Sequence, residues 1–236
     1  MTFVTVQYGE LLFTAEVRRT NRRTLGIAVH PDGLVVVTAP LDADVDAIRH
    51  CLRRRARWIA AQRAYFADFH PRTTERRWLP GETHLYLGRQ YRLRISNAAA
   101  SSPTVHRASP FLLIDGVAFN DPAGIERAVR DWYRDQARAV IDRRIPHCVA
   151  RFDRPLAPTT LTVRAMTSRW ASLSSTGRLT VNPDLVRAPI DAIDYVLTHE
   201  LAHTVVPDHG IRFMDLLDRV MPDHERRKRR LERTTA

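Results

Sequence analysis

The chain has 236 residues, of which 44% are hydrophobic and 27% are charged. This length suits one large domain or two small ones, and this composition excludes a wholly disordered chain. With 37 basic and 26 acidic residues the formal net charge is +11, which makes nonspecific nucleic acid a candidate partner.

The sequence indicates neither a membrane partner nor export. No apolar run approaches the roughly 18 to 20 residues that a membrane-spanning helix needs. The N-terminus lacks a basic region followed by an apolar stretch, so no secretory signal is expected. The only cysteines, Cys51 and Cys148, have no neighbouring cysteine at metal-ligand spacing. These features favour a cytoplasmic protein without disulfide bonds.

The first forty residues are predicted to form β-structure. Strand-forming residues dominate the segments 11–17, 25–30 and 34–38. The segment 30–33 is expected to be the turn between the last two, because Asp and Gly tolerate the left-handed backbone of a tight hairpin. Pro40 is expected to end this sheet segment.

A long helix is expected next, beginning near Asp42 or Asp44 and ended by His70-Pro71. Trp58 is interpreted as a core residue of this helix. The opposite face carries a basic stripe, which is usually a solvated surface and less often a phosphate contact. The stripe consists of Arg49, Arg53, Arg54, Arg55, Arg57 and Arg63. The arginine-rich composition also has a nonfunctional explanation, because the base composition of a genome biases the amino acids that it encodes.

Residues 72–80 have the character of a linker. A hairpin is expected from strands at 84–87 and 91–95, around a Gly-Arg turn. Residues 96–110 are rich in Ser, Ala and Pro and are predicted to be a loop, followed by a short strand at 111–114.

A second long helix is expected to run to about Phe152. Asp121 is its predicted cap and Pro122 stands at an early helical position, where proline is favoured. Pro146 is expected to kink or break it.

The last third begins with two predicted strands, at 161–165 and 179–181. They flank a polar stretch at 167–177. Pro189 is then expected to begin the helix that carries the candidate site.

The decisive motif is H-E-x-x-H at residues 199–203. Residues four apart on a helix lie one turn apart on one face, so His199 and His203 can share a zinc ion. Glu200 points to an adjacent sector, where it can activate a zinc-bound water without being a ligand. A catalytic zinc needs a third ligand, and His209 has the spacing of the longer H-E-x-x-H-x-x-G-x-x-H signature. The motif therefore predicts peptide-bond hydrolysis with Glu200 as general base.

The segment after the motif is expected to fold His209 back toward the metal. Val206 replaces the glycine of the longer signature, and the turn is expected at residues 206–208. Proline disfavours helix at the preceding residue, so Pro207 should end the helix, with a new one from Ile211. A chance match to H-E-x-x-H is the alternative. It is opposed by the apolar neighbours, beside which a Glu and two His would be costly to bury without a metal.

The motif identifies no group that stabilises the oxyanion. His224, Arg169 and Arg212 are weak candidates, and each has a surface or structural role as its alternative.

Several segments resemble those of the YgjP-like zinc metallopeptidases, relatives of the SprT-like group within the zincins. The most specific are M-T-S-R-W at 166–170, I-D-Y-V at 193–196, the H-E-L-A-H block, and M-P-D at 221–223. The resemblance covers nearly the whole chain. It implies a zincin fold with His199, His203 and His209 as Zn²⁺ ligands and Glu200 as catalytic base.

The chain departs from this family at one place that matters for the substrate cleft. Where the family continues Arg-Trp with Gly-Ser-Cys, this chain has Ala171-Ser172-Leu173. The methyl group of Ala171 occupies a position that glycine leaves open, and the thiol is missing. Neither change touches the three predicted ligands.

The expected fold class is α+β. Residues 1–120 are predicted to form an N-terminal β-rich portion with one long helix, and residues 121–236 a zincin-like catalytic portion with the H-E-x-x-H helix. The predicted function is a zinc-dependent metallopeptidase acting on peptides or proteins, and the SprT resemblance and net charge suggest DNA-associated substrates. The alternative is a basic nucleic-acid-binding or adaptor protein with a structural zinc site. The sequence leaves the oligomeric state open.

Overall fold

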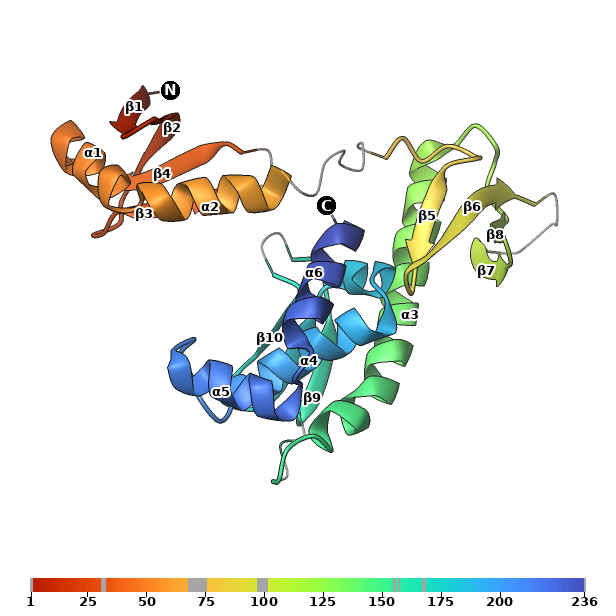
Figure 1. Ribbon diagram of the computed structural model, residues 1–236. Helices are drawn as coiled ribbons and strands as arrows, with labels where there is room; N and C mark the ends of the chain where they lie inside the picture. The colour runs from red at the N-terminus through yellow and green to blue at the C-terminus, as the bar shows by residue number, and fades with distance from the viewer. Residues whose placement is uncertain are drawn as a thin grey trace. The chain divides into compact units, whose positions relative to one another are not determined.

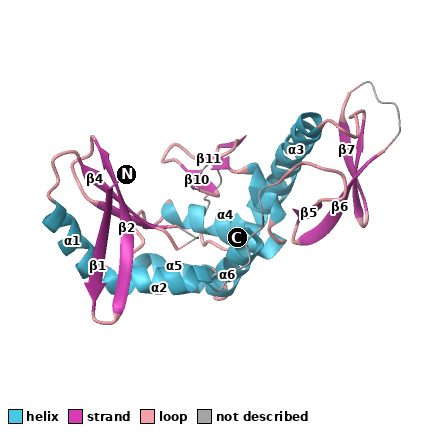
Figure 2. Cartoon of the chain, turned by 90° about the horizontal axis from the view of Figure 1, so that it is seen from above, coloured by secondary structure: helices cyan, strands magenta, loops and turns pink. Residues whose placement is uncertain are grey.

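The computed structural model describes residues 2–30, 33–67, 76–96, 102–154, 156, 158–166 and 169–235. The chain forms two compact units, Met1–Thr73 and Thr74–Thr235, here called unit 1 and unit 2. Each unit mixes helices with strands, which confirms the α+β class (Figures 1 and 2). The expected functional division at residue 120 stays a prediction. Among the described helices, none has both the length and the apolar character of a membrane span.

Unit 1 is a four-stranded sheet with two helices packed against it. Its strands are β1 (Thr2–Tyr8), β2 (Leu11–Thr20), β3 (Gly26–Val29) and β4 (Val35–Pro40). Their spatial order is β1-β2-β4-β3, with β2 and β4 parallel and the other neighbours antiparallel. The helices are α1 (Val45–Arg54) and α2 (Ala56–Ala67). The predicted hairpin between β3 and β4 is confirmed, although two residues of its turn, 31 and 32, lie outside the described residues.

The single long helix expected after Pro40 is two helices. Arg55 separates them with backbone angles of φ −100° and ψ 5°, outside the helical region. The break lets both helices turn an apolar face to one core, since Ile48 and Leu52 of α1 and Ile59 of α2 are fully buried there. The apolar periodicity continues across the break, so the break could not be predicted from the pattern of apolar residues. The predicted end of the long helix lies outside the described residues.

Trp58 was expected in the core and is instead 39% exposed. Its neighbour Ile59 and the preceding Ala56 occupy the buried face of α2, which turns the indole outward. Strand β1 was not predicted as a separate strand. It is defined by its antiparallel pairing with β2, which cannot be read from the residues of β1 alone.

Unit 2 begins with a second four-stranded sheet. Its strands are β5 (Thr83–Tyr86), β6 (Arg89–Ile95), β7 (Thr104–Ala108) and β8 (Phe111–Asp115), in the order β5-β6-β8-β7. The predicted β5–β6 hairpin is confirmed. The predicted loop at 96–110 is wrong in part, because it contains β7. That strand is mostly exposed and exists by antiparallel pairing with β8 rather than by burial.

The long helix α3 (Pro122–Val149) is confirmed together with its cap. The Asp121 Oδ1 atom accepts a hydrogen bond of 2.9 Å from the Gly124 N–H. Pro146 does not break the helix, contrary to one of the two expected outcomes. The buried residues Ile141 and Cys148 flank it and keep the last turns packed on the core.

The remainder of unit 2 is a three-stranded sheet with three helices and one short 3₁₀ helix. The strands are β9 (Thr160–Val163), β10 (Ala171–Leu173) and β11 (Arg178–Val181), in the order β10-β11-β9. The helices are η1 (Pro183–Arg187), α4 (Ile190–His203), α5 (Ile211–Val220) and α6 (His224–Thr235). Strand β10 lies in the stretch expected to be only polar, and α6 was not predicted.

The β5–β6 hairpin holds the segment that leads into α4. At its tip, the N–H groups of Leu87 and Gly88 donate to the carbonyls of Val186 and Arg187, at 2.7 and 3.0 Å. Gly88 has φ +77°, and a Cβ there would lie 2.9 Å from the Pro189 ring. Only glycine therefore fits both the turn and this close approach.

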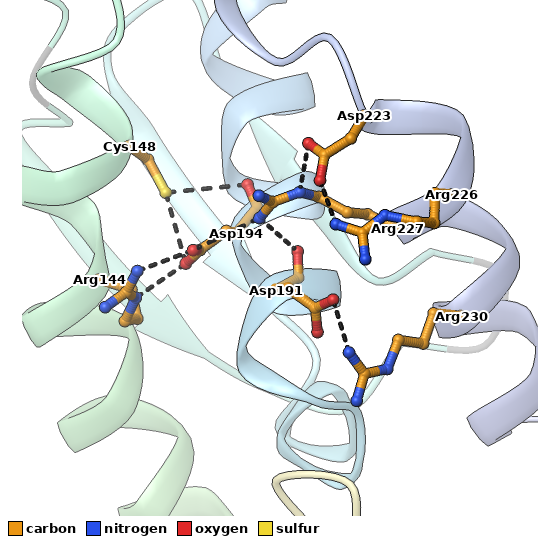
Figure 3. A network of polar contacts seen from close by, with 8 residues as sticks. All are labelled: Arg144, Cys148, Asp191, Asp194, Asp223, Arg226, Arg227 and Arg230. Carbon is orange, nitrogen blue, oxygen red and sulfur yellow. Dashed lines mark hydrogen bonds and ion pairs between the residues drawn. The ribbon is translucent and has the colours of Figure 1, made fainter.

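A buried ion pair fixes the orientation of α4 (Figure 3). The side chain of Asp194, on α4, is 5% exposed. It accepts two hydrogen bonds from the Arg144 guanidinium of α3, at 2.8 and 2.7 Å. On its other side, Arg227 of α6 lies 3.8 Å away and is itself bonded to Asp223. Helix α4 is thus tied by one carboxylate to both α3 and α6.

We expect Asp194→Ala to lower the free energy of unfolding of unit 2 by about 3 kcal/mol, because it leaves the Arg144 guanidinium unpaired in a partly buried position. Urea unfolding followed by tryptophan fluorescence measures this loss. The matched control is Asp131→Ala, which removes an exposed partner of Arg134 and should cost less than about 1 kcal/mol. Equal losses in the two variants would contradict the role assigned to Asp194.

Candidate active site

Helix α4 presents two imidazoles on one face. Its other faces are buried, by Ile193, Leu197 and Leu201 among others, so the polar face of the H-E-x-x-H block is the one left open. His199 and His203 lie one turn apart, and their Nε2 atoms are 3.2 Å apart. The predicted placement of this motif on a helix is therefore confirmed.

The chain turns back immediately after α4. The N–H groups of Val205 and Val206 both bond to the Ala202 carbonyl, which closes the last turn before Pro207. The reversal brings the Nε2 atom of His209 to 3.0 Å from that of His199 and 3.0 Å from that of His203. The third predicted histidine thus lies with the other two.

The cluster has the donor chemistry and spacing of a zinc site. Zinc–nitrogen bonds of about 2.05 Å at tetrahedral angles place nitrogens about 3.3 Å apart, close to the observed separations. His203 Nδ1 lies 3.3 Å from the Val206 carbonyl, which suits an Nδ1–H donor and leaves the Nε2 lone pair for a metal. Burial, together with its two neighbouring imidazoles, lowers the pKa of His199 to about 4, so that ring is neutral at pH 7. These residues fit a metal ion.

Phe213 of α5 forms an apolar support behind the three imidazoles. Its ring centroid lies 4.9 Å from that of His199, 4.5 Å from His203 and 4.9 Å from His209. Phe213 is fully buried, and its ring is stacked on that of His203. A rigid ring in contact with all three side chains restricts their rotation.

Glu200 is held by the neighbouring strand. Its Oε2 atom accepts a hydrogen bond of 3.1 Å from the N–H of Leu173 in β10. Burial raises the pKa of the Glu200 carboxyl, whereas this hydrogen bond and the charge of Arg169 act to lower it. The carboxylate is thus fixed in place and kept more basic than an exposed one.

These groups line one cavity of about 680 Å³, a size typical of ligand sites. The cavity is lined by Arg169, Trp170, Ala171, Ser172, Leu173, Tyr195, Val196, His199, Glu200, His203, Pro207 and His209. One wall is β10, the edge strand of its sheet. Its Leu173 N–H points away from the sheet toward Glu200, so this edge faces the site.

Of the three residues considered for stabilising the oxyanion, one lines the cavity and two do not. Arg169 lines the cavity as an exposed residue. His224 is buried elsewhere, with its Nε2 atom 2.9 Å from Asp218 Oδ1, and Arg212 is exposed on α5; neither lines the cavity. Trp170 lines it while also packing on the core.

Three contributors to the site were missed. Tyr195 lies four residues before His199, and this helical spacing could have placed it on the same face. Burial raises the pKa of its phenol to about 12, so the hydroxyl stays protonated. Phe213 had a recognisable apolar spacing, but nothing local placed it under the histidines. The Leu173 N–H had no signal, because it is a backbone group on a distant strand.

The departure at 171–173 does not disturb the cluster. The Ala171 methyl group is buried in the core of unit 2, and its backbone pairs with Val181 of β11. At the position of the missing thiol, Leu173 contributes through its main chain.

Comparison with known proteins gives one match that covers most of the chain. The solved structure of the metallopeptidase zymogen of Pyrococcus abyssi abylysin is similar at 23% identity and a TM-score of 0.31, over 40% of this chain and 87% of that chain. No curated protein sequence matches. Residues 23–234 match the YgjP-like, metallopeptidase domain family. A match of that extent assigns the chain to the YgjP-like metallopeptidase family, and with it a divalent metal and peptide or protein substrates.

Proposed function

We propose that the chain is a zinc-dependent metallopeptidase with His199, His203 and His209 as ligands and Glu200 as general base. One observation carries the proposal: three Nε2 atoms within 3.2 Å of one another open onto the cavity that Glu200 also lines. Three neutral nitrogen donors suit zinc, whereas magnesium and calcium prefer oxygen. When bound, zinc polarises the substrate carbonyl and lowers the pKa of a water to about 7.

The protein's own groups then have distinct tasks. Glu200 accepts a proton from the attacking water at its carboxylate and returns it to the leaving amine. The Leu173 N–H holds this carboxylate in position through one oxygen. The protonated Tyr195 hydroxyl and the Arg169 guanidinium are the donors in the cavity wall for the developing negative charge.

The edge of β10 supports an extended peptide as substrate. An edge strand offers main-chain donors and acceptors, to which a peptide can add as a further strand. This mode recognises the backbone of the substrate, so it fits many peptide sequences. The suggested DNA-associated targets and the cytoplasmic location stay predictions from charge and cysteine content.

The alternative is an adaptor or nucleic-acid-binding protein whose zinc is structural. A structural zinc site is closed by four protein ligands. Within the described residues, the cluster that could hold a metal has three members, and it opens onto a cavity beside a buried carboxylate. These features favour the enzyme, and a substitution of Glu200 distinguishes the two functions.

We expect Glu200→Gln to retain zinc and to lower kcat/KM by about 10²-fold or more, because the amide cannot accept the proton. Hydrolysis of a mixture of fluorescence-quenched peptides measures activity, and elemental analysis measures zinc. A variant that hydrolyses peptides as well as the parent chain would contradict the role of Glu200 as general base. A parent chain that contains zinc but hydrolyses none of the peptides would favour the structural-zinc alternative.

Chain purified without chelator should contain about one zinc ion, and His203→Ala should contain far less. Removal of zinc by a chelator should abolish hydrolysis, and added zinc should restore it to the parent chain but not to the variant. His106→Ala is the control, since that histidine lies on β7 and is exposed. Full zinc content in His203→Ala would exclude it as a ligand.

Phe213→Leu should weaken zinc binding about 10-fold or more, because a smaller, branched side chain leaves the three rings free to rotate. Competition with a fluorescent zinc chelator measures the affinity. Leu216→Val is the matched control, a similar loss of buried volume on the same helix and in the same apolar cluster. Similar affinities in both variants would reduce Phe213 to a packing residue.

A further inference from the structure

Exposed arginines gather where α1 meets α2 in unit 1. Arg53 and Arg54 end α1, Arg55 is the joint, and Arg57 lies in the first turn of α2. All four side chains are exposed, and none forms an ion pair or hydrogen bond with another described residue. Trp58 follows directly, with 39% of its surface exposed. These five residues are called the joint surface.

Helix electrostatics does not explain all of this charge. Basic residues stabilise the C-terminal end of a helix, which accounts for Arg53 and Arg54 in the last turn of α1 and for Arg55 at its C-cap. The first turn of a helix favours acidic residues instead, and α2 has none there. Arg57 lies in that first turn, so its charge opposes the dipole of α2. The stability of the helices therefore does not explain Arg57.

The packing of the two helices forces the joint surface outward. Ile48, Leu52, Ala56 and Ile59 fill the core against the sheet of unit 1. The four arginines and Trp58 lie between these buried positions and are exposed, so four cations stand beside an exposed indole in the sequence. The helices α1 and α2 follow one another beside the sheet of this unit in Figure 1.

We propose that the joint surface binds single-stranded nucleic acid, with the guanidinium groups on phosphates and the Trp58 indole stacked on a base. Guanidinium forks match phosphate oxygens in a bidentate manner, and this chain has a single lysine among its 37 basic residues. Tryptophan beside a track of positive charge is the combination that unpaired bases recognise without sequence preference.

An anionic membrane surface is the alternative ligand for the joint surface, because it also carries many negative charges. Helices that lie on a membrane insert an apolar face between the lipids. The apolar residues of α1 and α2 that pack on the sheet are buried in the core of unit 1. Among the side chains of these two helices that the structure describes, Trp58 is the one large apolar group that is exposed. Nucleic acid is therefore favoured, because it needs cations and a stacking platform but no apolar face.

Binding of single-stranded nucleic acid would be a second activity beside that of the proposed peptidase. The joint surface belongs to unit 1, whereas every residue of the catalytic cavity belongs to unit 2. An experiment can therefore disprove nucleic-acid binding by unit 1 without disproving peptide hydrolysis by unit 2, and the reverse. Together they would give the peptidase a raised effective concentration of proteins bound to the same strand.

The first test compares two variants of the full chain with equal loss of charge. The joint variant replaces Arg53, Arg54, Arg55 and Arg57 with Gln. The control replaces Arg127, Arg143, Arg178 and Arg229, four exposed arginines of unit 2, with Gln. Fluorescence anisotropy of a labelled single strand of about 20 nucleotides measures binding from about 50 to 200 mM salt.

The joint variant should lose at least about tenfold in affinity at low salt, and its slope of log affinity against log salt should fall by up to about 3, from four phosphate contacts. The control should bind like the parent chain. Equal losses in both variants would show that only net charge acts. Absence of binding at low salt, or loss of vesicle binding without loss of strand binding, would also overturn the proposal.

The second test isolates Trp58. Trp58→Ala should weaken binding to the single strand about fivefold or more, because stacking on one base is lost. On an abasic strand, which keeps the phosphates, the same substitution should have no effect. Equal effects on both strands would mean that the indole only supports the fold of unit 1, and thermal unfolding of the variant would show the corresponding loss.

Discussion

The orientation of α4 is the constraint on which the site depends. This helix carries His199, His203 and Glu200, and a small rotation would move all three relative to β10 and to His209. The buried carboxylate of Asp194, held from α3 and approached from α6, prevents that rotation. A buried ion pair contributes little net stability, because desolvation offsets most of the attraction, but breaking it is costly. Its effect here is to select one orientation of the helix.

The cluster itself shows why so many supports are needed. Three imidazole nitrogens that approach within 3.2 Å without a proton direct their lone pairs at one another, which is unfavourable unless a cation lies between them. Burial keeps His199 neutral, so a proton does not compete with a metal for its nitrogen. The apolar ring of Phe213 and the turn at Pro207 hold the three rings in an arrangement that suits a metal ion. The packing of the fold therefore offsets part of the free energy that is needed to bring the three donor nitrogens together.

The part of the site that could be predicted from the sequence is the part determined by local geometry. Helical spacing placed His199 beside His203, and the effect of Pro207 on the backbone predicted the return of the chain toward His209. The rest depends on contacts between distant segments. The Leu173 N–H is 27 residues from Glu200, and Arg144 is 50 residues from Asp194. No spacing rule reaches across such separations.

The errors in the predicted fold have the same physical cause. Strands β1, β7 and β10 are defined by pairing with a neighbour rather than by their own composition, and they were missed or taken for loop. The break at Arg55 left the apolar spacing of the two helices in one phase, so periodicity predicted one helix. Trp58 was therefore wrongly predicted to lie in the core. The smaller residues Ala56 and Ile59 occupy the core positions of α2 instead.

The two units divide the problem of selectivity between them. An edge strand such as β10 binds the backbone that every extended peptide presents, so it discriminates poorly between substrates. The proposed general base, Glu200, and the proposed set of imidazole ligands would act equally on all of these substrates. Discrimination must then come from side-chain contacts in the cavity or from a second surface that selects where the enzyme acts. A cationic surface with an exposed indole on a separate unit supplies the second kind, because it can concentrate the enzyme near its targets without altering the catalytic geometry.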